Sequence, residues 1–157
     1  MSVSPCPSED SVHASCVAWN GEAVLISGPP GAGKSELALR LMDAGFDLVA
    51  DDRVLLEGAV ASAPARLAGL IEVRGVGILR TPFVVKATVR LRVCLGLGQP
   101  RLPESRRDPW TGAVMLCLEP GFPGTVARIR AALKACCGPY EWVAGAGETL
   151  KKREDVK

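Results

Sequence analysis

Residues 28–35 read Gly28-Pro29-Pro30-Gly31-Ala32-Gly33-Lys34-Ser35. This stretch fits the pattern G-x-x-x-x-G-K-[S/T] of a phosphate-binding loop, or P-loop. Its glycines permit backbone turns that a Cβ atom would block, so successive N–H groups can point at phosphate oxygens. Lys34 would bring a positive charge to the β- and γ-phosphates, and the Ser35 hydroxyl can bind Mg²⁺. We therefore predict that this loop binds the phosphates of a nucleoside triphosphate together with Mg²⁺.

The residues on either side predict the strand and helix that a P-loop requires. Residues 23–27, Ala-Val-Leu-Ile-Ser, form a short apolar run that is typical of a buried strand. Residues 34–44 are predicted to be helical because Leu37 and Leu41 fall on one face, and Gly45 follows as a helix stop. The alternative interpretation, a chance Gly/Pro-rich turn, does not explain this flanking pattern.

Length and composition restrict the classes of protein. The 157 residues suit one domain, and 48% of them are hydrophobic, enough for a packed core. The formal net charge of +2 is too small to favour nucleic acid through bulk electrostatics. No apolar run reaches the length of a membrane span, and no secretion signal is recognisable. Six cysteines without C-x-x-C spacing argue against a zinc site. We expect a cytoplasmic protein that binds neither nucleic acid nor membrane.

Strand-like segments outnumber helical ones along the chain. Asn20-Gly21 joins two of them and predicts a hairpin. Strands are predicted at residues 12–19, 23–27, 47–50, 53–57, 59–63, 84–95 and 114–118, and helices at residues 34–44 and 125–136. We therefore predict an α/β fold, a P-loop-containing mixed β-sheet with few helices. The predicted domain is residues 12–144, between flexible ends at residues 1–11 and 145–157.

Two adjacent aspartates, Asp51 and Asp52, follow the predicted strand at residues 47–50. Asp52 lies 18 residues after Lys34, which leaves room for one helix and one strand, so the pair returns beside the loop. One carboxylate there can bind or orient the metal ion, and the other can accept a proton from an attacking hydroxyl. The alternative is a solvated turn, because Asp is common at strand ends. No Asn-Lys-x-Asp guanine motif is present, so an adenine nucleotide is the better match.

A second acidic candidate, Glu72, lies in an apolar segment at residues 70–79. Strand geometry would place Glu72 and Arg74 on the same face. They could be a metal-binding acid and a phosphate-binding arginine, or a surface ion pair of small energetic value. Gly75 and Gly77 favour the first interpretation, because glycine lets the backbone approach a ligand closely.

The predicted loop at residues 96–113 contains a basic cluster of Arg101, Arg106 and Arg107 with Trp110. Such a cluster is either a solvated face or a site for an acidic partner surface or a phosphate group. The sequence leaves both interpretations open.

Three segments match one known family in order and spacing. They are residues 33–39 (Gly-Lys-Ser-Glu-Leu-Ala-Leu), 45–54 (Gly-Phe-Asp-Leu-Val-Ala-Asp-Asp-Arg-Val) and 71–78 (Ile-Glu-Val-Arg-Gly-Val-Gly-Ile). Together with His13, which falls where the family has a histidine before the loop, they resemble HPr kinase/phosphorylase. The resemblance covers residues 12–95 and implies a fold similar to phosphoenolpyruvate carboxykinase.

The resemblance implies an enzyme with two opposing activities. Members of this family use ATP and Mg²⁺ to phosphorylate a serine of HPr, the small phosphocarrier of the sugar phosphotransferase system. They also remove that phosphate with inorganic phosphate, which releases pyrophosphate. The resemblance further implies a homo-oligomer that regulates the phosphotransferase system and carbon or nitrogen metabolism.

The resemblance also assigns site residues by position. The catalytic residues would be His13, Lys34, Asp52 and Arg101, the nucleotide-binding residues would be residues 28–35, and the metal-binding residues would be Ser35 and Glu72. Asp52 would be the base in the forward reaction and the acid in reverse. His13 would lie beside the reacting groups.

The chain departs from the family pattern in three respects. The full-length family has an additional N-terminal domain without a counterpart here, so we expect a short form with the catalytic C-terminal domain alone. Phe46 stands where the family often has histidine. Beyond residue 100 the family's basic loop for dephosphorylation is not recognisable, which favours the kinase direction. Two alternative functions are a small-molecule kinase with the same loop and a non-catalytic ATP-sensing module.

Overall fold

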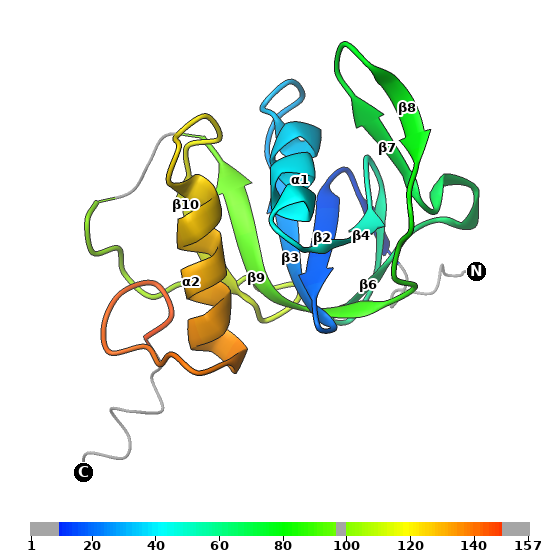
Figure 1. Cartoon of the computed structure of the whole chain (residues 1–157). Helices are drawn as coiled ribbons and strands as arrows, with labels where there is room; N and C mark the ends of the chain where they lie inside the picture. The colour runs from blue at the N-terminus through cyan, green and yellow to red at the C-terminus, as the bar shows by residue number, and fades with distance from the viewer. Residues whose placement is uncertain (1–9, 97–99, 149–157) are drawn as a thin grey trace.

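The computed structural model describes residues 10–96 and 100–148. Within these residues, an eight-stranded mixed sheet carries two α-helices, and a separate two-stranded hairpin stands beside it (Figure 1). The sheet strands are β1 (Asp10–Val12), β2 (Ser15–Trp19), β3 (Glu22–Ser27), β4 (Asp47–Ala50), β5 (Val54–Glu57), β6 (Val60–Ser62), β9 (Ala87–Leu95) and β10 (Val114–Leu118). The other elements are α1 (Lys34–Asp43), η1 (Ala65–Leu67), β7 (Leu70–Val73), β8 (Gly77–Arg80) and α2 (Thr125–Cys137). The predicted α/β fold with few helices is confirmed.

The direction of the strands determines where a ligand site can form. The strand order is β1-β5-β6-β9-β3-β2-β4, and β10 pairs with β9. Strands β3, β9 and β10 are parallel. Strand β4 is antiparallel to β2, which is antiparallel to β3, so β4 runs in the direction of β3. The carboxyl ends of β4, β3, β9 and β10 therefore share one edge of the sheet, the usual place for ligands in open α/β sheets.

The core lies on both faces of the sheet, which explains the apolar run of β3. Side chains of β2 and β3, among them Val24 and Ile26, pack with Leu37 and Leu41 of α1 and Ile129 of α2. A second apolar cluster covers the opposite face. A strand that is buried on both faces needs consecutive apolar residues rather than alternation. Helices α1 and α2 thus hold one face of the strand that leads into the P-loop (Figure 1).

The predicted hairpin at Asn20-Gly21 is confirmed by the antiparallel pairing of β2 and β3. Asn20 and Gly21 have φ values of 53° and 80°, as a two-residue hairpin turn requires. The single strand predicted at residues 12–19 is wrong. It is divided into β1 and β2, because β1 pairs with β5 whereas β2 pairs with β3 and β4.

The apolar segment at residues 70–79 forms the hairpin of β7 and β8, which projects beside the carboxyl edge of the sheet (Figure 1). At the ends of the described chain, Asp10 already belongs to β1, and residues 145–148 contact the loop before β10. The remainder of the predicted flexible ends lies outside the described residues. Among the described residues, no helix has the length and apolar character that a membrane crossing needs.

One buried carboxylate, that of Asp108, holds the loop before β10. Asp108 is 2% exposed and accepts hydrogen bonds from Arg92 Nη1 at 3.0 Å and from Thr111 Oγ1 at 2.7 Å. The backbone N–H groups of Trp110 and Thr111 also donate to it. Burial acts to raise the pKa of Asp108, but Thr111, Arg92 and the two N–H groups outweigh burial and lower it. The carboxylate is therefore most favourable in its ionised form.

We predict that Asp108→Asn lowers the free energy of unfolding by about 2–3 kcal/mol at neutral pH, because it leaves Arg92 without its buried partner. The folded-state pKa is lowered, so this contribution is present above the ordinary pKa of aspartate and is lost as pH falls through the folded value. Urea denaturation at neutral and acidic pH measures both effects. Glu57→Gln, at an exposed position, is the control. Equal unfolding free energies for the two variants at neutral pH would contradict the assignment.

Candidate functional site

The P-loop connects β3 to α1. Its positions require glycine for two different structural reasons, backbone conformation and lack of space. Gly31 and Gly33 adopt φ values of 80° and 100°, which strain any residue with a Cβ atom. At Gly28, a Cβ atom would lie 3.2 Å from the Cβ atoms of both Ala32 and Leu95. The loop therefore keeps close to the end of β9 while its backbone turns into the first residues of α1.

Lys34 lies at the start of α1 and is 8% exposed. Its Nζ donates hydrogen bonds to the carbonyl oxygens of Gly28 at 3.1 Å and Pro29 at 3.2 Å. A charge buried to this degree requires such partners. The ammonium group thus lies over the loop at the positive end of a helix dipole, which is an arrangement that suits a bound anion.

Asp51 connects three segments of the site. It is 5% exposed, and its Oδ1 accepts hydrogen bonds from Ser15 Oγ at 2.6 Å and Ser35 Oγ at 2.7 Å. Its Oδ2 accepts a longer bond, 3.3 Å, from the backbone N–H of Glu72. The sequence left open which aspartate would serve the metal shell, and the contact with the P-loop serine favours Asp51. Ser15 was missed at the sequence level, because an isolated serine in a strand carries no signal.

Asp52 lies beside His13, and both side chains face solvent. His13 Nε2 lies 2.9 Å from Asp52 Oδ1, with side-chain exposures of 50% and 66%. With Asp52 ionised, Nε2 carries the hydrogen and donates it. Asp52 has a φ of 74°, at the centre of a tight turn closed by the Arg53 N–H and the Asp51 carbonyl at 2.8 Å. A left-handed conformation costs an aspartate about 1 kcal/mol. At Asp52 this conformation directs the carboxylate outward.

Apart from Asp51, which lies behind its wall, these groups line one cavity of about 550 Å³. Its lining residues are His13, Ser15, Pro30, Gly31, Gly33, Lys34, Ser35, Glu36, Asp52, Glu72 and Arg74. The start of β2 and the residues just before it, the P-loop, the segment after β4 and the β7–β8 hairpin all contribute. Of the predicted catalytic residues, Arg101 does not line this cavity and instead lines a separate one.

The donor set suits a hard, oxygen-binding cation such as Mg²⁺. No group of three or more His, Cys, Asp or Glu side chains in the described part of the chain forms a metal cage. Mg²⁺ does not need one, because it is usually held by one or two carboxylates, water and substrate phosphates. The hydroxyl of Ser35 and the carboxylate of Asp51, already 2.7 Å apart, fit this pattern. Glu72 borders the same cavity.

The comparisons with known proteins agree with this site. The family described as HPr Serine kinase C-terminal domain matches residues 6–90, more than half of the chain. This chain belongs to the HPr serine kinase C-terminal domain family. The match includes the P-loop, the two aspartates and the β7–β8 hairpin, and it ends within β9.

Individual members of the HPr kinase family show the same relationship. HPr kinase/phosphorylase of Levilactobacillus brevis is 46% identical over 74 residues, 44% of this chain and 24% of that protein. HPr kinase/phosphorylase of Aromatoleum aromaticum is 44% identical over 112 residues, 63% of this chain and 34% of that protein. The chain thus spans about a quarter to a third of the length of these curated relatives.

A solved member of the HPr kinase family shares the fold. The Hpr(Ser) kinase/phosphatase from Coxiella burnetii superposes with a TM-score of 0.61 at 27% identity, covering 78% of this chain and 91% of that one. The predicted fold class, like that of phosphoenolpyruvate carboxykinase, is therefore confirmed. Phe46, where the family often has histidine, precedes β4 at the edge opposite the P-loop and packs edge-to-face on Trp19.

The loop glycines provide a prediction with a matched control. Gly31 and Gly21 have the same φ of 80°, and at neither position would a Cβ atom meet another atom within 4 Å. Gly31→Ala and Gly21→Ala should therefore each cost about 1 kcal/mol of stability through backbone strain. We predict that Gly31→Ala alone weakens binding of a nucleoside triphosphate, by about tenfold or more, since only Gly31 lies in the P-loop.

Isothermal titration calorimetry with Mg-ATP and thermal unfolding measure the two effects separately. Equal loss of nucleotide affinity in both variants would mean that the effect comes from stability, and would contradict the role given to Gly31.

Proposed function

We propose that this chain is an ATP- and Mg²⁺-dependent protein kinase that phosphorylates a serine of an HPr-type phosphocarrier protein. The observation that carries the proposal is one cavity lined by Lys34 and Ser35 of the P-loop and by the His13–Asp52 pair. Membership of the HPr serine kinase C-terminal domain family supports the choice of acceptor. The relatives named HPr kinase/phosphorylase support the reaction type.

In the proposed reaction, the P-loop holds the triphosphate. The N–H groups from Gly31 onward donate to its phosphate oxygens, since Pro29 and Pro30 have none. Lys34 exchanges its carbonyl partners for phosphate oxygens, and the N-terminus of α1 adds favourable dipole charge. A bound Mg²⁺ would neutralise charge on the β- and γ-phosphates. Ser35 and Asp51 would hold that ion, with Glu72 at the border of its shell.

Asp52 is the proposed base. The acceptor serine oxygen attacks the γ-phosphorus, the bond to the β-phosphate oxygen breaks, ADP leaves and the serine proton passes to Asp52. His13 donates a hydrogen bond to Asp52 and so holds the carboxylate toward the cavity. The 66% exposure of Asp52 leaves room for a protein serine to approach from solvent. Placement and electrostatics, rather than covalent chemistry, would supply the rate.

The same groups would serve the reverse reaction. An oxygen of inorganic phosphate attacks the phosphorus of phosphoserine, the serine oxygen leaves with the proton from Asp52, and pyrophosphate forms. Action on HPr would link the protein to regulation of the phosphotransferase system and carbon or nitrogen metabolism. We further propose that the protein is cytoplasmic and homo-oligomeric, as the resemblance to longer relatives implies.

Two substitutions separate binding from transfer. Lys34→Ala should abolish transfer and weaken Mg-ATP binding at least tenfold, because it removes the positive charge from the loop. Asp52→Asn should keep Mg-ATP affinity within about twofold and lower transfer at least a hundredfold, because it removes the proton acceptor. Labelled ATP with purified HPr, followed by detection of phosphoserine, measures transfer, and calorimetry measures binding.

Asp47→Asn is the matched control, since Asp47 is exposed at the opposite end of β4. Full transfer activity in Asp52→Asn would remove Asp52 as the base. Transfer to a metabolite pool but not to HPr would support a small-molecule kinase. Nucleotide binding without transfer to any acceptor, and indifferent to Asp52→Asn, would support a sensing module.

A further inference from the structure

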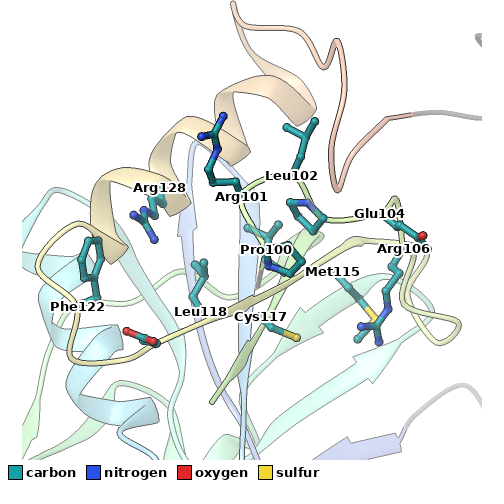
Figure 2. Close-up of a pocket in the computed structure, with 13 residues that line it drawn as sticks. Pro100, Arg101, Leu102, Glu104, Arg106, Met115, Cys117, Leu118, Phe122 and Arg128 are labelled. Atoms are coloured by element: carbon teal, nitrogen blue, oxygen red, sulfur yellow. The ribbon is translucent and has the colours of Figure 1, made fainter. Parts of the chain in front are cut away.

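A second and larger cavity, of about 840 Å³, lies at the β10 side of the sheet (Figure 2). It is lined by Pro100, Arg101, Leu102, Pro103, Glu104, Arg106, Met115, Leu116, Cys117, Leu118, Glu119, Phe122 and Arg128. All of these residues follow the part of the chain that matches the family, which ends at residue 90. Nothing in the proposed phosphoryl transfer uses this cavity.

The cavity is joined to the P-loop by the turn between β10 and α2. Pro120 in that turn lies next to the loop, since a Cβ atom at Gly33 would be 3.6 Å from the Pro120 Cβ. Arg40 of α1 donates to the carbonyl oxygens of Pro120 at 2.8 Å and Phe122 at 3.3 Å. Thr125 Oγ1 donates to the Glu119 carbonyl at 2.6 Å and closes the turn. The helix that begins in the P-loop therefore holds one wall of the second cavity in place.

The strand order places the two cavities on opposite sides of the P-loop. Asp51 and Asp52 follow β4, which lies beyond β2 on one side of β3. The second cavity is formed at β10, which lies beyond β9 on the other side of β3. For a ligand whose phosphates lie in the loop after β3, with its terminal phosphate toward Asp52, the second cavity lies on the side of the loop away from that phosphate.

The lining suits a planar group with polar edges. Phe122 is 37% exposed, and the Arg128 guanidinium lies 4.2 Å from the centre of its ring. Leu102, Met115 and Leu118 supply apolar surface, and Figure 2 shows Arg128 beside Phe122. Rings and guanidinium planes stack on nucleobases, and arginine also binds phosphate oxygens. A volume of about 840 Å³ is ample for a nucleoside.

We propose that this cavity binds the nucleoside half of the nucleotide, with Phe122 and Arg128 against the base. The proposal rests on the proposed function, because it assumes that a nucleoside triphosphate occupies the P-loop. It gives Arg101 a different place from the one expected from sequence, at the nucleoside rather than beside the transferred phosphoryl group.

The test compares two ligands that share phosphates but differ in the nucleoside. Calorimetry on the full chain would measure the affinities of Mg-ATP and Mg-tripolyphosphate for wild type, Phe122→Leu and Arg128→Ala. We expect each variant to lower the affinity for Mg-ATP about tenfold, which is typical for the loss of one stacking contact. The affinity for Mg-tripolyphosphate should stay within about twofold of wild type. Phe122→Tyr keeps the ring and should retain the affinity for Mg-ATP.

Arg130→Ala is the matched control for Arg128→Ala. Arg130 lies two residues further along α2, but its guanidinium is 5.9 Å from the Trp19 ring, away from the second cavity. It should leave both affinities unchanged.

The outcomes distinguish this proposal from the proposed function. If Phe122→Leu and Arg128→Ala leave Mg-ATP affinity unchanged, the nucleoside lies elsewhere, and the proposed kinase function is unaffected. If the affinities for both ligands fall together, the substitutions act through the turn on the P-loop, and the nucleoside assignment is wrong. If wild type binds neither ligand, the proposed function and this inference are both wrong.

Discussion

The site depends on one buried carboxylate, that of Asp51, because it receives hydrogen bonds from three separate segments. Ser15 comes from the strand beside the P-loop strand, Ser35 from the first turn of α1, and the N–H of Glu72 from the β7–β8 hairpin. Hydrogen bonds to a buried charge are among the stronger ones in proteins. Removal of this carboxylate would leave two hydroxyl groups and one N–H without their acceptor. The same carboxylate therefore fixes both the position of the hairpin and the orientation of the P-loop serine.

Much of the fold could be predicted from sequence because its elements carry local signals. The P-loop, the Asn20-Gly21 turn and the short strand at residues 47–50 each follow from residue types within a few positions. The division between β1 and β2 could not be predicted, because it depends on pairing with β5, whose partner choice is non-local. The residues alone brought Asp51 and Asp52 to the loop without dividing their roles, and only the resemblance named Asp52 as the base. The contacts that distinguish the two aspartates are with residues 36 and 39 positions away in the chain.

The region after residue 96 shows the limit of sequence reasoning more clearly. Arg101 was placed with the catalytic residues by resemblance, but its neighbours in the fold are residues of β10 and α2. The position of Arg101 depends on the parallel pairing of β10 with β9, a contact between segments separated by a long loop. No local pattern reveals which loop a basic cluster will face, because that depends on the edge at which the last strand joins the sheet.

The direction of the strands and the hydrogen bonds of Lys34 together explain how a small domain can hold a preorganised site. Four strands end at one edge, so the loop, the aspartates and the β10–α2 turn lie at the same edge of the sheet. Lys34 donates to two loop carbonyls, and these bonds satisfy its buried charge. The proposed phosphate ligand would displace those two bonds and would offer formal negative charge in exchange for carbonyl dipoles. Since the backbone already holds its left-handed glycines and Arg40 already holds the neighbouring turn, most of the rearrangement on the proposed binding would fall on the Lys34 side chain.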